Sequence, residues 1–328
     1  MDSKQIPYVD PLSHKPLRII KENEKISMVT DEGSTYPFFN EIPDLTYPVE
    51  LKKADRETKE FYDQRSEAYE KNLHLTFKTH NENEEKCRNS FVDSLDLKPD
   101  YKVLDLACGT GRDSLIIANR LNRNGKIFMV DISYEMIKIC KEKTQHMQIP
   151  KEYCIANAAY LPFPDNFFDA LYSFGAVGEF SEIKKSLFEM VRVTKPGGKI
   201  VIGDESIPPW LRETYFAKVL MTTNPQFKAE LPLNEMPIEA RNVRLRWVIG
   251  GVFYLIDFEV GEGEPSANFD FEIPGIRGGT YRTRYEGQLE GVTPEAKKLA
   301  YEIVKKKGIS MHQWLDMVVK NEAKKEFK

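Results

Sequence analysis

The sequence predicts an α/β protein with a seven-stranded, mostly parallel sheet that ends in an antiparallel hairpin. Two observations predict this fold. Apolar strands alternate with amphipathic helices from about residue 100 to residue 205, and such alternation places parallel strands side by side with helices on both faces. An apolar hairpin follows between residues 243 and 260. A small β-rich module precedes this region, and a helical extension follows it.

Length and composition restrict the class of protein. A chain of 328 residues allows one large domain with small appendages. The net charge of −4, from 47 basic and 51 acidic residues, argues against nucleic acid as a partner. The first ten residues lack the basic and apolar blocks of a signal peptide, and no apolar run approaches the roughly 20 residues that span a bilayer, so we expect no membrane contact. The four cysteines form no CxxC pair, so we expect a cytoplasmic protein without a bound metal. The sequence does not determine the oligomeric state.

The elements follow in order along the chain. Residues 1–48 are rich in proline and turn formers and predict a β-rich module, and residues 49–97 are charged and helical. Apolar runs and helical periods then predict strands at 102–107, 126–130, 152–156, 168–174 and 199–205, with helices at 112–121, 133–145 and 181–193.

The pattern changes after the fifth strand. The proline-rich segment 206–240 suits a cover over the carboxyl edge of the sheet. Apolar and arginine residues then alternate up to Gly250 and Gly251, which predicts a hairpin with a two-residue turn. We therefore divide the chain into a module at 1–48, a main domain at 49–262, and an extension at 263–328 with two helices split at Gly308.

The loop "DLACGTGRD", residues 105–113, raises the question of which ligand it serves. A dinucleotide loop has a third glycine where this chain has Ser114. Asp105 ends the strand, where a carboxylate repels pyrophosphate and suits a cation. Asp131 ends the next strand, 20 residues beyond Gly111, and can accept hydrogen bonds from both ribose hydroxyls. The residues indicate a small cationic cofactor with a ribose and argue against a nicotinamide dehydrogenase.

Four motifs in order carry a resemblance to a known family: "VLDLACGTGRDS", "VDIS", "ANAAYLPFPDNFFDALYSF" and "EMVRVTKPGGKIVI". Over roughly residues 55–262 the chain resembles the class I S-adenosylmethionine-dependent methyltransferases, with a core similar to methyltransferase types 11 and 25. The resemblance implies a Rossmann-like fold, S-adenosyl-L-methionine as cofactor, and methyl transfer as the activity.

The same resemblance implies a set of cofactor-binding residues. Asp105 would face the methionine end, Gly109 and Gly111 would let the backbone approach, and Asp131 would hold the ribose. The family often has an aspartate where this chain has Asn157, whose amide oxygen can still accept from adenine. The remaining predicted residues are Tyr62, Tyr69, Ala107, Cys108, Thr110, Ile132, Met136, Ala158 and Phe174. The two tyrosines either form a lid over the cofactor or serve only in packing.

The first 48 residues resemble the small zinc ribbon attached to, or partnered with, some RNA and protein methyltransferases. The resemblance lies in "DPLSHKPL" and "VTDEGSTYPFFNEIPDL". The positions of the four zinc-binding cysteines match Asp10, Ser13, Val29 and Glu32, and none of these is a thiolate. We therefore expect a metal-free ribbon held by its apolar side chains, namely Leu17, Tyr36, Phe38, Ile42 and Leu45.

Methyl transfer from a sulfonium is an in-line displacement, in which the enzyme mainly positions the acceptor and excludes water. Acceptors approach the carboxyl ends of the strands, where the loop "SFGAVGEF" contains one carboxylate, Glu179. We expect Glu179 to act as a catalytic base or to orient the acceptor, with capping of the following helix as the alternative.

Two segments are candidates to form the acceptor pocket. The cover contributes aromatic residues, Trp210, Tyr215, Phe216 and Phe227. The later group of Arg277, Tyr281, Arg282, Arg284 and Tyr285 either packs the extension or contacts a planar or anionic acceptor.

Three functions remain open at this point. A small-molecule methyltransferase fits the apolar cover and the mild net charge. An RNA base methyltransferase would show strongly salt-dependent RNA affinity. A non-catalytic scaffold would bind the cofactor without turnover.

Overall fold

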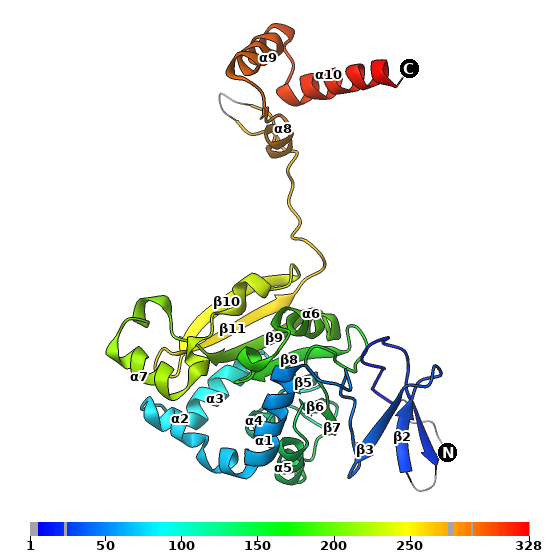
Figure 1. Ribbon diagram of the computed structural model, residues 1–328, viewed down its shortest axis with the longest axis vertical. Coiled ribbons are helices and arrows are strands. Elements are labelled where there is room, and N and C mark those ends of the chain that lie inside the picture. Colours follow the sequence, from blue (N-terminus) through cyan, green and yellow to red (C-terminus); the bar gives the residue numbers. More distant parts are fainter. Residues whose placement is uncertain (1–5, 23–24, 275–277, 290, 328) are drawn as a thin grey trace. The chain divides into compact units, whose positions relative to one another are not determined.

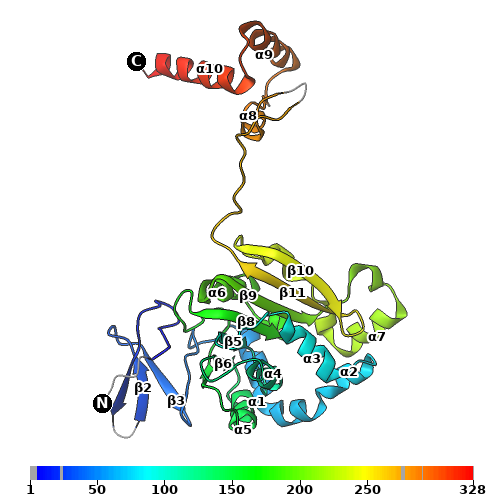
Figure 2. The ribbon, with the colours of Figure 1, turned by 180° about the vertical axis from the view of Figure 1, so that it is seen from behind.

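The computed structural model describes residues 6–22, 25–274, 278–289 and 291–327. The chain forms two units, Met1–Glu264 and Pro265–Lys328. The first unit contains a four-stranded sheet and a seven-stranded sheet with helices on both sides of the latter (Figures 1 and 2). The predicted fold class is confirmed.

The seven-stranded sheet has the order β10-β11-β9-β8-β5-β6-β7. Strands β5 to β9 are parallel, and β11 runs antiparallel between β9 and β10. Their bounds are β5 Lys102–Leu106, β6 Lys126–Asp131, β7 Lys151–Ile155, β8 Phe168–Phe174, β9 Thr194–Glu205, β10 Ala240–Val248 and β11 Phe253–Val260. The strand order reverses between β5 and β8, and in such sheets ligands bind beyond the carboxyl ends at that point.

Alternating apolar residues give the sheet two buried faces. In β5, Leu104 packs on one face and Val103 on the other. Helix α6 (Ile183–Val193) covers the first face, and helices α3 (Glu84–Asp93), α4 (Arg112–Ala118) and α5 (Tyr134–Thr144) cover the second. Helix α1 (Lys53–Asn72) and the short α2 (His74–Thr79) precede α3. The helices predicted near 112, 133 and 181 are thus present, although α4 ends at Ala118.

The amino-terminal module packs directly on this sheet, next to β7 (Figure 1). Its strands are β1 Arg18–Glu22, β2 Lys25–Val29, β3 Thr35–Phe39 and β4 Ile42–Pro43. Residues 156–167, all of them described, connect β7 to β8 without a helix, and the module lies where such a helix would pack. The Leu45 amide donates to the Ile155 carbonyl at 2.8 Å, and the Tyr8 ring lies 5.5 Å from that of Phe163. The module therefore completes the core of the main domain.

The predicted interior of the module is largely buried. Leu17, Tyr36, Ile42 and Leu45 are buried, whereas Phe38 is only partly so. Asp10, at a position of a zinc-binding cysteine, accepts hydrogen bonds from the Ser13 amide and the Tyr36 hydroxyl, both at 2.7 Å. A carboxylate thus ties the first turn to β3. Among the described residues, no three histidine, cysteine, aspartate or glutamate side chains gather in a group that could hold a metal ion.

The hairpin turn is longer than predicted. Val248 pairs with Phe253, so four residues connect β10 to β11, and the expected two-residue turn is wrong. The wider turn lets Ile249 fold inward, where it is 2% exposed. The cover segment consists of helix α7 (Tyr215–Thr223) and 3-10 turns at Pro209–Leu211, Pro225–Lys228 and Pro232–Glu235.

The second unit is helical. Helices α9 (Pro294–Lys307) and α10 (Met311–Glu326) confirm the predicted pair split at Gly308, and α8 (Tyr281–Glu286) was not predicted. Arg282 pairs with Asp270 at 2.7 Å, and Arg284 donates to the Gly278 carbonyl at 3.0 Å, so both are bound within this unit. Arg277 lies outside the described residues. In the described part of the chain, none of the helices is long and apolar enough to cross a membrane.

Candidate functional site

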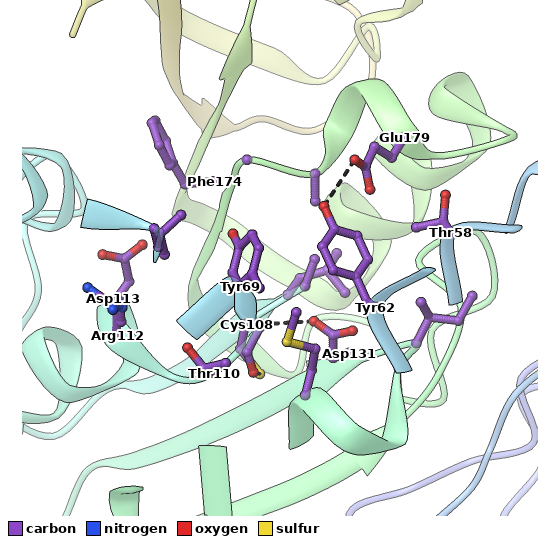
Figure 3. Close-up of a pocket in the computed structure, with 18 of the residues that line it drawn as sticks. Thr58, Tyr62, Tyr69, Cys108, Thr110, Arg112, Asp113, Asp131, Phe174 and Glu179 are labelled. Carbon is purple, nitrogen blue, oxygen red and sulfur yellow. Dashed lines mark hydrogen bonds between the residues drawn. The ribbon is translucent and has the colours of Figure 1, made fainter. Parts of the chain in front are cut away.

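A cavity of about 430 Å³ lies at the carboxyl ends of the parallel strands. Its walls come from helix α1 and from the loops that follow β5, β6, β7 and β8 (Figure 3). Every predicted cofactor residue except Gly111 lines this cavity, and so does Glu179. The topology therefore gathers at one place side chains that are more than 100 residues apart in the sequence.

The glycines of the first loop have different surroundings. Both adopt the left-handed conformation, with φ of +52° at Gly109 and +78° at Gly111. A Cβ at Gly109 would meet no atom within 4 Å, whereas one at Gly111 would lie 2.6 Å from the Cys140 sulfur. Gly109 thus leaves open space beside the cavity. Gly111 lets the start of α4 approach α5.

Asp105 lies near the carboxyl end of β5 and lines the cavity. It is 2% exposed and accepts a hydrogen bond from the Ser114 hydroxyl, so the residue that replaces the third glycine supports this carboxylate. Burial, together with nearby Asp113 and Asp131, raises the pKa of Asp105 well above its usual range. A cationic ligand would favour its ionised form.

Asp113 lines the cavity beside Asp105. Its Oδ2 accepts from Arg88 Nη1 at 2.8 Å and from the Tyr172 hydroxyl at 3.3 Å. Its Oδ1 is buried and has no hydrogen-bond partner within the described residues. Such an unpaired acceptor in a cavity wall suits a ligand donor. Sequence reasoning missed Asp113 although it follows Gly111 in the same motif.

Asp131 is held by two backbone amides. Its Oδ2 accepts from the Gly109 amide at 2.8 Å, and its Oδ1 accepts from the Ser133 amide at 2.9 Å. Burial raises the pKa of Asp131 to about 6, and the amides oppose that shift. Because each carboxylate oxygen has two lone pairs, the side chain can still accept hydrogen bonds from a ligand.

Three carboxylates of helix α1 bind side chains on other elements around the cavity. Asp55 accepts from the Ser181 hydroxyl at 2.6 Å, and Asp63 accepts from the Ser133 hydroxyl at 2.6 Å. Further along, Glu70 accepts from the Thr110 hydroxyl and from Lys143. Sequence reasoning missed these residues, although a spacing of about two turns places them on one side of the helix.

The two predicted lid tyrosines lie on the same helix. Tyr62 and Tyr69 meet edge to face with ring centroids 5.5 Å apart, and both line the cavity (Figure 3). Burial raises the pKa of both hydroxyls.

Glu179 faces the cavity from the short turn after β8 (Figure 3). The Tyr62 hydroxyl donates to its Oε1 at 3.0 Å. Burial raises the pKa of Glu179 to about 7, with smaller contributions from Asp204 and Asp131, while the Tyr62 bond lowers it. The alternative role of helix capping is wrong, because the N-cap of α6 is Glu182. Glu179 thus lines the cavity and is not the N-cap of α6.

The far end of the cavity differs from the predicted acceptor pocket. Trp210 and Tyr215 are 69% and 84% exposed and do not line it, and Phe227 is buried against Phe253. The cover instead contributes Asn224 and Gln226, because the first turn of its 3-10 segment faces inward. Other lining residues at this end are Phe77, Phe174, Glu205, Ile249 and Phe253.

The ionisable side chains that line the cavity are mainly acidic. Its described lining includes neither lysine nor histidine, and its arginines, Arg88 and Arg112, are both paired with carboxylates. The acidic lining residues are Asp55, Asp105, Asp113, Asp131, Glu179 and Glu205.

Known methyltransferases are similar to part of this chain. The chain is 40% identical to the ubiquinone/menaquinone biosynthesis C-methyltransferase UbiE of Wigglesworthia glossinidia brevipalpis over 124 residues, 37% of this chain and 49% of that protein. It is 33% identical to the demethylmenaquinone methyltransferase of Bacillus mycoides over 115 residues, 35% of this chain and 48% of that protein. The chain thus spans about half the length of these curated relatives.

A solved structure, a SAM dependent methyltransferase from Aquifex aeolicus, shares 20% identity with a TM-score of 0.39, covering 53% of this chain and 89% of that one. The model of the ubiE/COQ5 methyltransferase family matches residues 50–224, from α1 through the cover helix. This match spans more than half of the sequence and includes most of the cavity wall. The chain belongs to the ubiE/COQ5 methyltransferase family.

Proposed function

We propose that this protein is a cytoplasmic methyltransferase that transfers the methyl group of S-adenosyl-L-methionine to a small-molecule acceptor. The carrying observation is that Asp105 and Asp131, at the ends of adjacent strands, face one cavity with the Gly109 backbone between them. The names of its relatives support methyl transfer. Four cysteines without disulfides, all in the described part of the chain, support a reducing compartment.

The residues present fit this cofactor. The bound cofactor would supply an electrophilic methyl group on a positively charged sulfur. Asp131 would accept hydrogen bonds from the ribose hydroxyls, and Asp105 with the unpaired Asp113 Oδ1 would accept from the ammonium of the methionine part. The open space at Gly109 gives the ligand access to the backbone.

Glu179 is the proposed base. The bond between the methyl carbon and the sulfur would break as the acceptor binds the methyl group, S-adenosylhomocysteine would leave, and Glu179 would take the proton that the acceptor releases. A carboxyl whose pKa lies at about 7 is suited to this work near neutral pH. Tyr62 orients the group through Oε1 and leaves Oε2 for the acceptor. Helix α1 covers the cavity and excludes water from the reaction.

The lining indicates the acceptor class. Phe174 and Phe253 are nearly parallel, with centroids 6.1 Å apart, and they suit a planar ring. Glu179 and Glu205 suit hydroxyl donors, whereas Asn224 and Gln226 suit carbonyl or hydroxyl groups. With both arginines already paired, an anionic acceptor fits poorly. A neutral hydroxylated ring, in keeping with the quinone chemistry named for the relatives, is our proposed acceptor.

Calorimetry tests the cofactor. The chain should bind S-adenosylmethionine and S-adenosylhomocysteine but not NAD. The variant Asp131→Ala should weaken binding by about 1.5–3 kcal/mol, as expected for hydrogen bonds to a charged group. Asp100→Ala, at an exposed position, is the matched control. Tight NAD binding, or unchanged affinity in Asp131→Ala, would contradict the assignment.

A methyl-transfer screen with labelled cofactor tests the acceptor. Turnover on neutral hydroxylated rings supports the proposal. Exclusive turnover on RNA would identify a base methyltransferase, and cofactor binding without any turnover would identify a scaffold.

A further inference from the structure

A buried hydrogen bond joins helix α1 to the loop after β7. Asn157 Nδ2 donates to Asp55 Oδ2 at 3.3 Å, and the two residues are 5% and 6% exposed. Both line the cavity. Asp55 also accepts from the Ser181 amide at 3.0 Å and from the Ser181 hydroxyl at 2.6 Å. One carboxylate of α1 thus holds two different loops of the cavity wall.

This contact determines which way the Asn157 amide points. Its nitrogen is the end that donates to Asp55, and its Oδ1 accepts from the Ala159 amide at 3.0 Å. The carbonyl oxygen has a second lone pair. A flipped amide would bring its oxygen against the Asp55 carboxylate and its nitrogen against the Ala159 N–H, and both contacts would be repulsive. Asp55 therefore holds the Asn157 amide in the orientation in which Asn157 Oδ1 is free to accept a further hydrogen bond.

The sheet order indicates what this acceptor meets. Strand β6 ends in Asp131 and lies between β5, which carries the glycine loop, and β7, which leads to Asn157. A ligand with its ribose at Asp131 and its methionine part at Asp105 has its base on the β7 side. The exocyclic amino group of adenine is a hydrogen-bond donor, and Asn157 Oδ1 is an acceptor.

We propose that Asp55 is a positioning residue for adenine recognition: it fixes the Asn157 amide so that Oδ1 accepts from the adenine amino group. This inference rests on the proposed function. It also explains why an asparagine is suitable at position 157. An aspartate there would place a second carboxylate oxygen about where Nδ2 now lies, 3.3 Å from Asp55 Oδ2.

The test is a charge-swap cycle measured by calorimetry with S-adenosylhomocysteine. Asn157→Asp should weaken binding at least tenfold, because two carboxylates would face each other. In the double variant Asp55→Asn, Asn157→Asp, the amide and the carboxylate exchange places and the hydrogen bond is restored. Affinity should return to within about threefold of the parent, a coupling of the size found for residues in contact. Asn119→Asp adds the same charge at an exposed position and is the control.

Binding of a second ligand distinguishes a role of Asp55 in adenine recognition from a role in the stability of the fold alone. The inosine analogue of S-adenosylhomocysteine lacks the amino donor. The parent and the double variant should bind it about tenfold more weakly than S-adenosylhomocysteine, and Asp55→Ala should lose most of this preference.

Tight binding by Asn157→Asp, a double variant no better than that single variant, or an unaltered preference in Asp55→Ala would overturn the inference while leaving the proposed function intact. Failure of the parent chain to bind S-adenosylhomocysteine would overturn both.

Discussion

The surroundings of Glu179 make ionisation of its carboxyl group unfavourable in the folded protein. Glu179 is partly buried near other acids and has a single hydrogen-bond donor, the Tyr62 hydroxyl, among its described partners. Burial therefore raises the pKa of Glu179 to about 7, compared with about 4.3 for an exposed glutamate. Ionising this group in the folded protein is unfavourable, and this penalty has a measurable pH dependence.

The sign of that dependence follows from proton linkage. Because the folded pKa of Glu179 lies above the unfolded value, its contribution to stability is fully present below about pH 4. It falls as the pH rises and is lost above the folded pKa of about 7. In Glu179→Gln this titration is absent. We compare the free energy of unfolding of the variant with that of the parent at each pH. This difference should be about 1–3 kcal/mol more favourable to the variant at pH 8 than at pH 4.

Urea denaturation at the two pH values measures this difference. Glu67→Gln, at an exposed position of α1, should show no such change. Methyl transfer should be lost in Glu179→Gln at pH 8, where the parent carboxylate is ionised and can act as a base. A pH-independent difference in stability would show that Glu179 titrates normally.

At the scale of elements, the packing of α4 against α5 restricts the residue type at position 111. This restriction is stronger than the one at Gly109 in the loop after β5. Gly111 has φ of +78°, and its Cα faces the Cys140 sulfur of α5. A side chain there meets two penalties, a left-handed backbone and a steric overlap. At Gly109, with φ of +52° and open space around it, only the first penalty applies.

The variant Gly111→Ala should therefore lower the free energy of unfolding by about 2–4 kcal/mol, and Gly109→Ala by only about 1 kcal/mol. Urea denaturation of both variants measures this. Removing the sulfur should relieve the overlap, so Gly111→Ala should be less harmful in a Cys140→Ala background than in the parent. Equal losses at the two glycines would contradict this explanation.

At the scale of the first unit, the amino-terminal module is part of the main core. Leu45 is 0% exposed and belongs to the same apolar cluster as Leu104 and Phe128 of the large sheet. The module packs beside β7 in place of a crossover helix. Because apolar contacts cross this boundary, the module and the sheet should unfold together.

Leu45→Ala should lower the free energy of unfolding of the whole first unit by about 2–5 kcal/mol, in one transition seen by all probes. Leu12→Ala, at a position that is 57% exposed, should have little effect. Two separate transitions would show an independent module. Elemental analysis of protein purified without chelator should find no zinc, and EDTA should not shift the Tm. One zinc per chain would contradict the metal-free ribbon.

The sequence by itself determined the sheet and the identity of many cavity residues. Strand and helix periodicity follow from local patterns, and Asp105 and Asp131 were recognisable because the carboxyl ends of parallel strands meet at one edge. Glu179 could be selected because it is the single carboxylate of its loop. These inferences depend on short-range spacing and on the topology that strand alternation implies.

Only the tertiary structure decided the contacts between distant segments. The carboxylates of α1, the inward turn of Asn224 and Gln226, the packing of Gly111 on Cys140 and the burial of the module against β7 each join residues far apart in sequence. The aromatic residues of the cover were misplaced for the same reason: an apolar side chain is equally suited to a core, a surface pair or a pocket. Which of these it occupies depends on the packing of the whole chain, because burial is non-directional and carries no local pattern.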